Sequence, residues 1–294
     1  MPTFSTPEPI TVDIWVPAGN IWVTAADRPD TVVDVQPSDV GQDIDVRAAE
    51  QTRVDLADGH LSVRAPRARV WGLFGRTPSI EVTVTVPTGS RVTSETMAGA
   101  FRATGRLGEC RIKSSAGDIR LEDADQIDLD SGAGEITAGR ISGNAEVTTG
   151  SGKVRLRQVG GSAVVKNSNG DNWIGSVAGD VRVSTANGGI TVDHAYGDVT
   201  ATTAMGAVRI GEVVRGSVSL KTAMGELEVG VRRGTAAWLD AQTRFGQVRN
   251  RLEPTAAPGA QEETVEVRAR TSYGDIVIHH TDSTGSSTDS GVAA

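Results

Sequence analysis

Two nine-residue units follow one another in the middle of the chain: Gly152-Lys153-Val154-Arg155-Leu156-Arg157-Gln158-Val159-Gly160 and Gly161-Ser162-Ala163-Val164-Val165-Lys166-Asn167-Ser168-Asn169. The third and fifth positions of each unit are apolar, and the residues around them are mostly polar. An alternation with a period of two over about five residues is typical of a β-strand with one buried face. Each unit therefore predicts one short strand, and its glycine predicts a tight bend with backbone angles that other residues avoid.

The unit recurs along the chain with almost no slippage. Glycines nine residues apart lie at 134, 143, 152, 161, 170, 179, 188, 197 and 206, and the series resumes at 216 and 225. The units are of two alternating kinds, because every second one has a small eighth residue and a polar seventh one. The polar seventh positions are Ser114, Ser131, Thr149, Asn167, Thr185, Thr203 and Thr222. The true repeat is thus about 18 residues with two strands and two unlike corners, which predicts stacked rungs.

Three solenoids with 18-residue rungs compete for this pattern. The left-handed hexapeptide helix needs an aliphatic residue every six positions, which the sequence does not provide. A calcium-binding roll needs an acidic ligand at each equivalent corner, but Lys153, Ser162 and Ala207 occupy that position in several repeats. We therefore expect an all-β protein: a metal-free, two-sheet parallel β-solenoid with an N-terminal β cap and no cofactor.

Particular runs of sequence also carry a resemblance to a known family. Ser115-Ala116-Gly117-Asp118-Ile119-Arg120-Leu121 and Ala178-Gly179-Asp180-Val181-Arg182-Val183 are similar to the Ser-x-Gly-Asp-Ile/Val repeats of a bacterial β-strand-repeat family labelled "putative adhesin". That family is a domain of unknown function, and the similarity covers roughly residues 10 to 280. The resemblance implies a repeat fold and supplies no catalytic residues.

The chain divides into four parts by composition and spacing. Residues 1–9 hold three prolines and are predicted to be disordered. Residues 10–107 read as short antiparallel or mixed strands that cap the solenoid, including one at 43–47. Residues 108–281 form the solenoid, with irregular rungs after Gly225 in which 231–243 and 250–263 are insertions and strands at 264–270 and 275–279 finish the stack. The Ser/Thr-rich residues 282–294 are predicted to be a disordered tail.

Two places leave the local structure open. Pro17-Ala18-Gly19-Asn20 suggests a hairpin that places Trp15 opposite Trp22, either packed between two layers or exposed to a ligand. Asn172 falls in an inward position of its repeat, so either the register slips locally or the amide is buried with partners. We favour the slip.

Composition bounds the function. The 294 residues carry a net charge of −8, so nucleic acid is a poor partner because phosphate neutralisation needs a basic face. The first residues lack the basic and apolar regions of a signal peptide, and no apolar run is long enough to span a membrane. These features predict a cytoplasmic protein, with peripheral contact at a membrane left open.

No constellation of residues indicates an enzyme. Adjacent strand residues point to opposite faces, so His279 and His280 cannot chelate one metal from a regular strand. Asp128 and Asp130 share an outward face, which suits either acid–base chemistry or, as we prefer, a solvated acidic edge. The single cysteine, Cys110, falls in an inward position and is expected to lie in the core.

One stretch stands out as a candidate contact site. Residues 64–76 hold four arginines around three large apolar residues in an otherwise acidic chain. The candidate contact residues are Arg67, Arg69, Trp71, Leu73, Phe74 and Arg76. They suit either a plug that closes the end of the solenoid or a contact with a protein partner or an anionic membrane, where aromatic and arginine side chains are favoured anchors.

The resulting expectation is a non-catalytic scaffold or binding protein whose ligand and oligomeric state are undetermined and whose partner is a protein, such as one of the cell envelope. A self-assembling filament protein of the bactofilin class and a carbohydrate-active β-helix enzyme are the alternatives.

Overall fold

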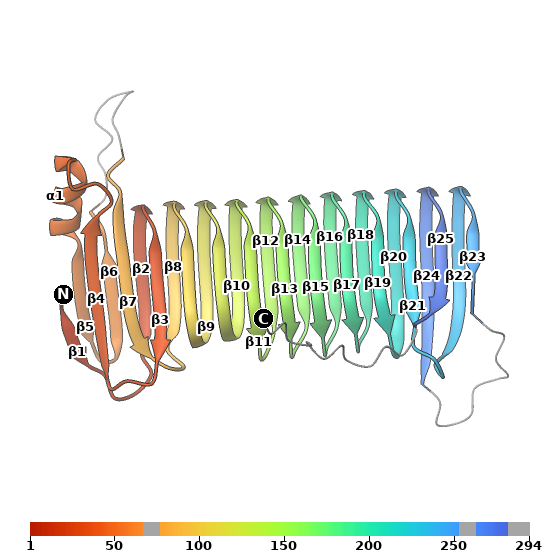
Figure 1. The fold of residues 1–294 in the computed structure, drawn as a ribbon, viewed down its shortest axis with the longest axis horizontal. Coiled ribbons are helices and arrows are strands. Elements are labelled where there is room, and N and C mark those ends of the chain that lie inside the picture. Colours follow the sequence, from red (N-terminus) through yellow and green to blue (C-terminus); the bar gives the residue numbers. More distant parts are fainter. Residues whose placement is uncertain (67–76, 253–262, 282–294) are drawn as a thin grey trace, which may run out of the picture.

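The structure, a computed structural model, describes residues 1–66, 77–252 and 263–281. These residues form a long rod of stacked rungs with the single helix α1 (Asp43–Gln51) of the described residues at one end (Figure 1). Each rung places one strand in each of two sheets, and the strands of successive rungs pair in parallel. The predicted two-sheet parallel β-solenoid is therefore confirmed.

The two sheets are joined through the long strands β9 and β10, each of which crosses from one sheet to the other. In spatial order the first sheet contains β5 (Arg53–Ala57), β6 (His60–Arg64), β2 (Thr11–Ala18), β8 (Arg91–Ala98), the second halves of β9 (Phe101–Ala116) and β10 (Ile119–Ala133), β12 (Ala145–Ser151), β14 (Ala163–Asn169), β16 (Val181–Asn187), β18 (Val199–Met205), β20 (Gly216–Met224), β24 (Thr264–Tyr273) and β22 (Ala236–Phe245). The second contains β1 (Thr3–Ser5), β4 (Asp30–Pro37), β7 (Ile80–Pro87), β3 (Ile21–Ala26), the first halves of β9 and β10, β11 (Ile136–Ile141), β13 (Val154–Val159), β15 (Asn172–Val177), β17 (Ile190–Ala195), β19 (Val208–Val213), β21 (Leu227–Val231), β25 (Ile276–His280) and β23 (Val248–Asn250).

The core lies between the two sheets and consists of straight columns of aliphatic side chains. Val147, Val165 and Val183 are buried neighbours in one column, each 18 residues after the last. Each buried side chain of this size contributes about 1.5–3 kcal/mol. The columns explain why a register shift is disfavoured, since a slip of one residue would turn every such side chain to solvent.

Glycine is required at one of the two kinds of corner. Gly152, Gly170 and Gly188 have φ of 147°, 138° and 135°, in a region that side chains with a Cβ atom rarely enter. A Cβ atom on each would also overlap the carbonyl oxygen of the corner glycine one rung earlier. The intervening glycines, such as Gly161 and Gly179, do not share the positive φ. The expectation of unusual backbone angles thus holds at every second corner.

Asn172 keeps the register of the repeat, so the favoured interpretation of a slip is wrong. It lies between Val154 and Ile190 in neighbouring rungs and is 1% exposed. Its Nδ2 donates to the carbonyl oxygen of Gly170 at 3.1 Å, and its Oδ1 accepts from Nδ2 of Asn167 at 3.1 Å. Buried polar groups are tolerated when they are hydrogen-bonded, and this pairing explains why an amide replaces an aliphatic residue here.

The solenoid begins far earlier than Gly108. Strands β2 and β3 do not form the expected hairpin, because β2 pairs in parallel with β6 and β8, and β3 pairs in parallel with β7 and β9. Gly19 has a φ of 125°, as at the later corners. A turn of proline, glycine and asparagine suits a hairpin and a solenoid corner equally well, so local sequence could not separate them.

The outermost elements at this end also differ from expectation. Residues 3–5, predicted to be disordered, form β1, which pairs antiparallel with β4. The strand expected at 43–47 is part of helix α1, whose first turn carries Asp43 and Asp45, where acidic side chains favour the helix dipole. Asp45 is buried and accepts the backbone N–H of Ser79 at 2.9 Å. The antiparallel pairs β4–β7 and β5–β6, together with α1, make this the capped end of the rod.

The C-terminal rungs are stacked out of chain order. Strands β24 and β25 lie between the rung of β20 and β21 and the rung of β22 and β23. The last rung in space is thus built from residues 236–250, most of which the spacing had placed in insertions. The prediction that 264–270 and 275–279 finish the stack is wrong, because glycine spacing records chain order and not spatial order.

Candidate functional site

The predicted contact residues Arg67, Arg69, Trp71, Leu73, Phe74 and Arg76 lie outside the described residues, so the choice between a plug and a contact stays a prediction. The residues that precede them are described. Ala65 and Pro66 follow β6 at the capped end and line a hollow of about 840 Å³.

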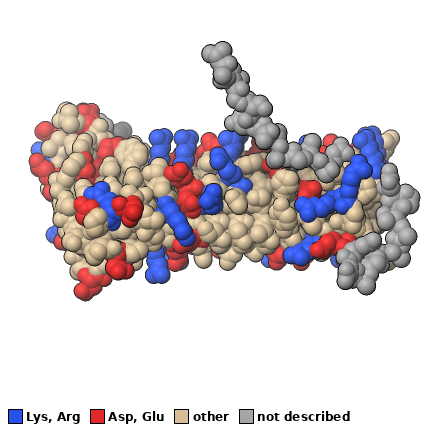
Figure 2. All heavy atoms as spheres, turned by 60° about the horizontal axis from the view of Figure 1, so that its bottom comes forward, with Lys and Arg blue, Asp and Glu red and all other residues tan. Residues whose placement is uncertain are grey.

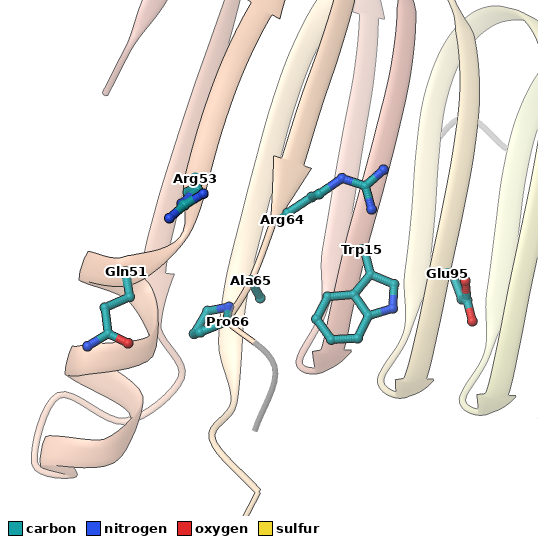
Figure 3. A pocket seen from close by; sticks show the side chains of 7 residues that line it. All are labelled: Trp15, Gln51, Arg53, Arg64, Ala65, Pro66 and Glu95. Carbon is teal, nitrogen blue, oxygen red and sulfur yellow. The ribbon is translucent and has the colours of Figure 1, made fainter. Parts of the chain in front are cut away.

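This hollow, here called the arginine hollow, is formed by side chains from α1, β2, β5, β6 and β8 and by the two residues that follow β6. Its lining residues are Trp15, Gln51, Arg53, Arg64, Ala65, Pro66 and Glu95. Figure 3 shows Arg53 and Arg64 on one side, with Trp15, Ala65 and Pro66 below them in that view. The hollow therefore combines two cationic groups and the carboxylate of Glu95 with an aromatic and apolar surface.

The two arginines are register partners on neighbouring strands, and Figure 3 shows the guanidinium group of Arg64 extending above Trp15 and away from that of Arg53. Arg53 of β5 lies directly opposite Arg64 of β6 in an antiparallel pair, a placement of like charges that is normally unfavourable. Arg64 donates from Nε to Oγ of Ser62 at 3.1 Å, and neither guanidinium forms an ion pair with a described residue. An anionic segment bound in the hollow would reduce the excess of positive charge and accept charge-assisted hydrogen bonds.

Trp15 and Trp22 do not form the aromatic pair that the hairpin implied. Trp15 lies on the first sheet between Arg64 and Glu95, whereas Trp22 lies on the second sheet beside Arg102. Only Trp15 reaches the arginine hollow, where it is partly exposed.

The Gly-Asp corners have a structural role. Oδ1 of Asp180 accepts the backbone N–H of Asp198 at 3.1 Å, and Oδ1 of Asp198 accepts that of Ser217 at 2.8 Å. At the other corner, Oδ1 of Asp171 accepts the N–H of Gly189 at 2.9 Å. Each of these side chains ties one rung to the next, which accounts for the recurrence of aspartate after glycine without any ion.

Of the two candidate acids on the outward face of β10, Asp128 is paired with a cation of the neighbouring rung. Oδ2 of Asp128 accepts from Nε of Arg111 at 3.2 Å. The predicted acidic edge is wrong, because β10 lies inside the sheet between β9 and β12. Figure 2 shows basic and acidic side chains interspersed along one face of the rod, so the described surface there does not gather one sign of charge.

A partly buried carboxylate anchors the start of the C-terminal segment. Glu212 accepts from Arg232 at 2.6 Å and from Oγ1 of Thr281 at 3.0 Å. Burial alone would raise the pKa of Glu212, but these hydrogen bonds and the charges of Arg232 and His194 outweigh it and hold the pKa below its ordinary value. His194 is 3.9 Å from the carboxylate. In the part of the chain that the structure describes, no group of three His, Cys, Asp or Glu side chains has the geometry of a metal site.

Cys110 is fully buried, as expected of a core residue. Burial, with smaller effects from the charges of Glu109 and Asp125, raises the pKa of its thiol to about 12. A protonated, enclosed thiol is a poor nucleophile.

An exposed apolar ladder was missed by the sequence analysis. Met205, Met224, Tyr273 and Phe245 occupy equivalent positions on consecutive rungs and are 49–57% exposed. The rings of Phe245 and Tyr273 stack with centroids 4.8 Å apart. Each of these residues directly precedes a corner glycine, which was the available signal. The ladder ends on β22, the last strand of the stack.

The fold and its sites define a β-solenoid protein with a capped end and an end formed by a rung whose outer strand edges are unpaired among the described residues. The family whose sequence pattern matches is Toastrack DUF4097, and the match extends over residues 20–293. The chain belongs to this family of domains of unknown function.

The solved structures that match the chain are distant in sequence. A crystal structure of a "putative adhesin" from Bacteroides fragilis NCTC 9343 is 11% identical, with a TM-score of 0.42 and coverage of 94% of this chain and 95% of that chain. One from Parabacteroides merdae ATCC 43184 is 11% identical, with a TM-score of 0.38 and 94% coverage of both chains. No curated protein matches the chain. Among the described residues, no helix has the length and hydropathy to cross a bilayer.

Proposed function

We propose that the protein is a non-catalytic binding solenoid whose arginine hollow holds an acidic, partly apolar segment of a protein partner. The observation that carries this proposal is the uncompensated pair Arg53 and Arg64 beside the exposed part of Trp15. Carboxylates of the segment would accept hydrogen bonds from the guanidinium groups, and an adjacent apolar side chain would pack on the indole ring.

A peptide suits the site better than a membrane surface. The cationic groups are local and line a concave surface, whereas the whole chain has a net charge of −8, which opposes approach to an extended anionic surface. The contact predicted for residues 67–76 is compatible with this, since that segment follows Pro66 directly in sequence. An envelope location would follow from the identity of the partner.

A non-catalytic role is supported by what the other polar residues do. The corner aspartates bond to the backbone of adjacent rungs, Asp128 pairs with Arg111, and Cys110 is enclosed. These groups are committed to the stability of the stack.

The test uses the full chain and a fluorescein-labelled peptide of alternating glutamate and leucine. We expect saturable binding by fluorescence anisotropy that weakens with salt, because screening acts on exposed charges. The double variant Arg53→Ala, Arg64→Ala should bind at least tenfold more weakly. The control Arg140→Ala, Arg182→Ala removes the same charge from two exposed arginines that form no ion pair with described residues, and it should bind within twofold of the parent.

Equal binding by the two double variants, or no binding by the parent, would refute the proposal. Phosphatidylglycerol vesicles form a separate arm. Vesicle binding that depends on Arg53 and Arg64, without peptide binding, would replace the protein partner with a membrane.

A further inference from the structure

The end of the rod formed by β22 and β23, here called the bare end, has unpaired strand edges and partly exposed core residues. Among the described residues, β22 pairs only with β24 and β23 only with β25, so each has one unpaired edge within that part of the chain. The inward side chains Ala237, Leu239 and Ala241 are only partly buried, and Val248 is 45% exposed. Their counterparts one rung inside are at most 1% exposed: Val265, Val267, Ala269 and Ile276. An edge of this kind is a template for further strand pairing.

The two ends of the rod are not equivalent. At the capped end, α1 packs on β4 and β7 and lies at the extremity of the rod (Figure 1). The helix and the antiparallel pairs β4–β7 and β5–β6 interrupt the parallel stacking there, so a further parallel rung does not match this end. Continued head-to-tail growth is therefore disfavoured, and a bare rung can be covered most simply by another bare rung.

We infer that the rung of β22 and β23 binds the same rung of a second copy of the chain about a two-fold axis perpendicular to the sheets. Such an axis keeps each sheet in its plane, so β22 meets β22 of the second copy in antiparallel orientation and β23 meets its own counterpart. Both sheets and the core then continue from one copy into the other. The interface is self-complementary and closed, as two-fold interfaces are.

The side chains of β22 favour a register centred on Ala241. Inward residues stay inward only when the pairing is centred on a residue, and a centre at Asp240 would oppose two carboxylates, which is unfavourable. A centre at Ala241 places Trp238 opposite Arg244 of the second copy. Trp238 is 73% exposed, and Arg244 forms no ion pair with a described residue. Arginine on an indole face is a favourable cation–π contact, so each copy supplies what the other lacks.

The register determines which engineered cysteine forms a link. In this pairing Ala241 lies opposite itself, at the short Cα separation that a disulfide requires. Under mild oxidation Ala241→Cys should give a covalent dimer in high yield, since the native Cys110 is enclosed. Thr200→Cys, on the outer face of β18, is the control and should stay monomeric on denaturing gels.

Sedimentation of the full chain over a concentration series gives the second readout. The parent should be in monomer–dimer exchange. Arg244→Glu should raise the dimer dissociation constant at least tenfold, whereas Arg182→Glu, the same charge reversal in mid-rod, should not. Both variants should keep the parental melting temperature at concentrations where the parent is monomeric. A monomer at all concentrations, or assemblies that grow without limit, would overturn the inference. The variants of Arg53 and Arg64 lie at the other end and should dimerise normally, so this test is independent of the peptide contact.

Discussion

Asn167 donates a hydrogen bond from Nδ2 to Oδ1 of Asn172 at 3.1 Å, inside the core of the stack. The equivalent positions in adjacent rungs hold threonine and an aliphatic residue: Thr149 and Thr185, and Val154 and Ile190. In this rung the two hydrogen-bonded amides thus take the place of the threonine and the aliphatic residue found in the adjacent rungs.

Asn167→Thr should lower the free energy of unfolding by about 1–3 kcal/mol, because it leaves a buried amide oxygen without its donor. Adding Asn172→Ile restores the pattern of the neighbouring rungs and should recover most of the loss. Denaturant unfolding of both single variants and the double variant measures the coupling. Additive effects would show that the two amides act independently.

Replacing a buried threonine of the polar column by valine should change the stability by different amounts at different rungs. Oγ1 of Thr222 donates to the carbonyl oxygen of Gly206 at 3.1 Å, whereas Oγ1 of Thr149 has no hydrogen-bond partner among the described residues. Thr222→Val should cost about 1 kcal/mol, and Thr149→Val should be neutral or stabilising. Thermal unfolding of the two variants provides the comparison, and equal losses would contradict it.

Adjacent glycines at one corner should differ sharply in their tolerance of alanine. Gly188 has a φ of 135°, and a Cβ atom there would overlap the carbonyl oxygen of Gly170. The nearest atoms to a Cβ on Gly189 are 3.5 and 3.6 Å away. Gly188→Ala should therefore destabilise the fold by several kcal/mol, while Gly189→Ala should change it by less than about 1 kcal/mol. Chemical denaturation can rank the pair, and similar values would argue against this corner geometry.

The Cys110 thiol should resist modification in the native state. Its pKa of about 12 keeps it protonated at pH 8, where an unfolded cysteine, with a pKa of about 8.5, is partly ionised. Ellman's reagent should label the native protein only as fast as it unfolds, whereas the exposed thiol of a Ser115→Cys variant should be labelled at once.

The same thiol should make the stability depend on alkaline pH. Because the pKa of Cys110 is raised in the folded state, its contribution to the free energy of unfolding is retained below about pH 8.5 and falls as the pH rises toward 12. Cys110→Val should lack that part of the pH dependence.

Glu212 should make the free energy of unfolding depend on pH in the acidic range. Its pKa is held below the ordinary value, so its contribution is present above the unfolded pKa, about 4.3, and is lost as the pH falls through the folded pKa. The stability difference between the parent and Glu212→Gln should shrink on acidification from pH 7 to pH 3. A difference that is constant with pH would mean that Glu212 is not held by Arg232 and Thr281 as its charged form.

The sequence alone was sufficient for the architecture of the middle of the rod. A period of two within strands, glycines nine residues apart and two alternating corner types admit one stacking, because every column must bury the same face. The same logic placed Cys110 in the core.

Only the tertiary structure decided the pairings that join residues far apart in the chain. Local sequence could not show that β2 and β3 form a rung or that Asn172 accepts a hydrogen bond from Asn167. Nor could it show that β24 and β25 lie between the rung of β20 and β21 and the rung of β22 and β23. For the same reason it could not place Arg53 opposite Arg64 or align Met224, Tyr273 and Phe245. A turn or an apolar alternation specifies a strand and its buried face, but strand neighbours are chosen by the burial and hydrogen bonding of the whole stack.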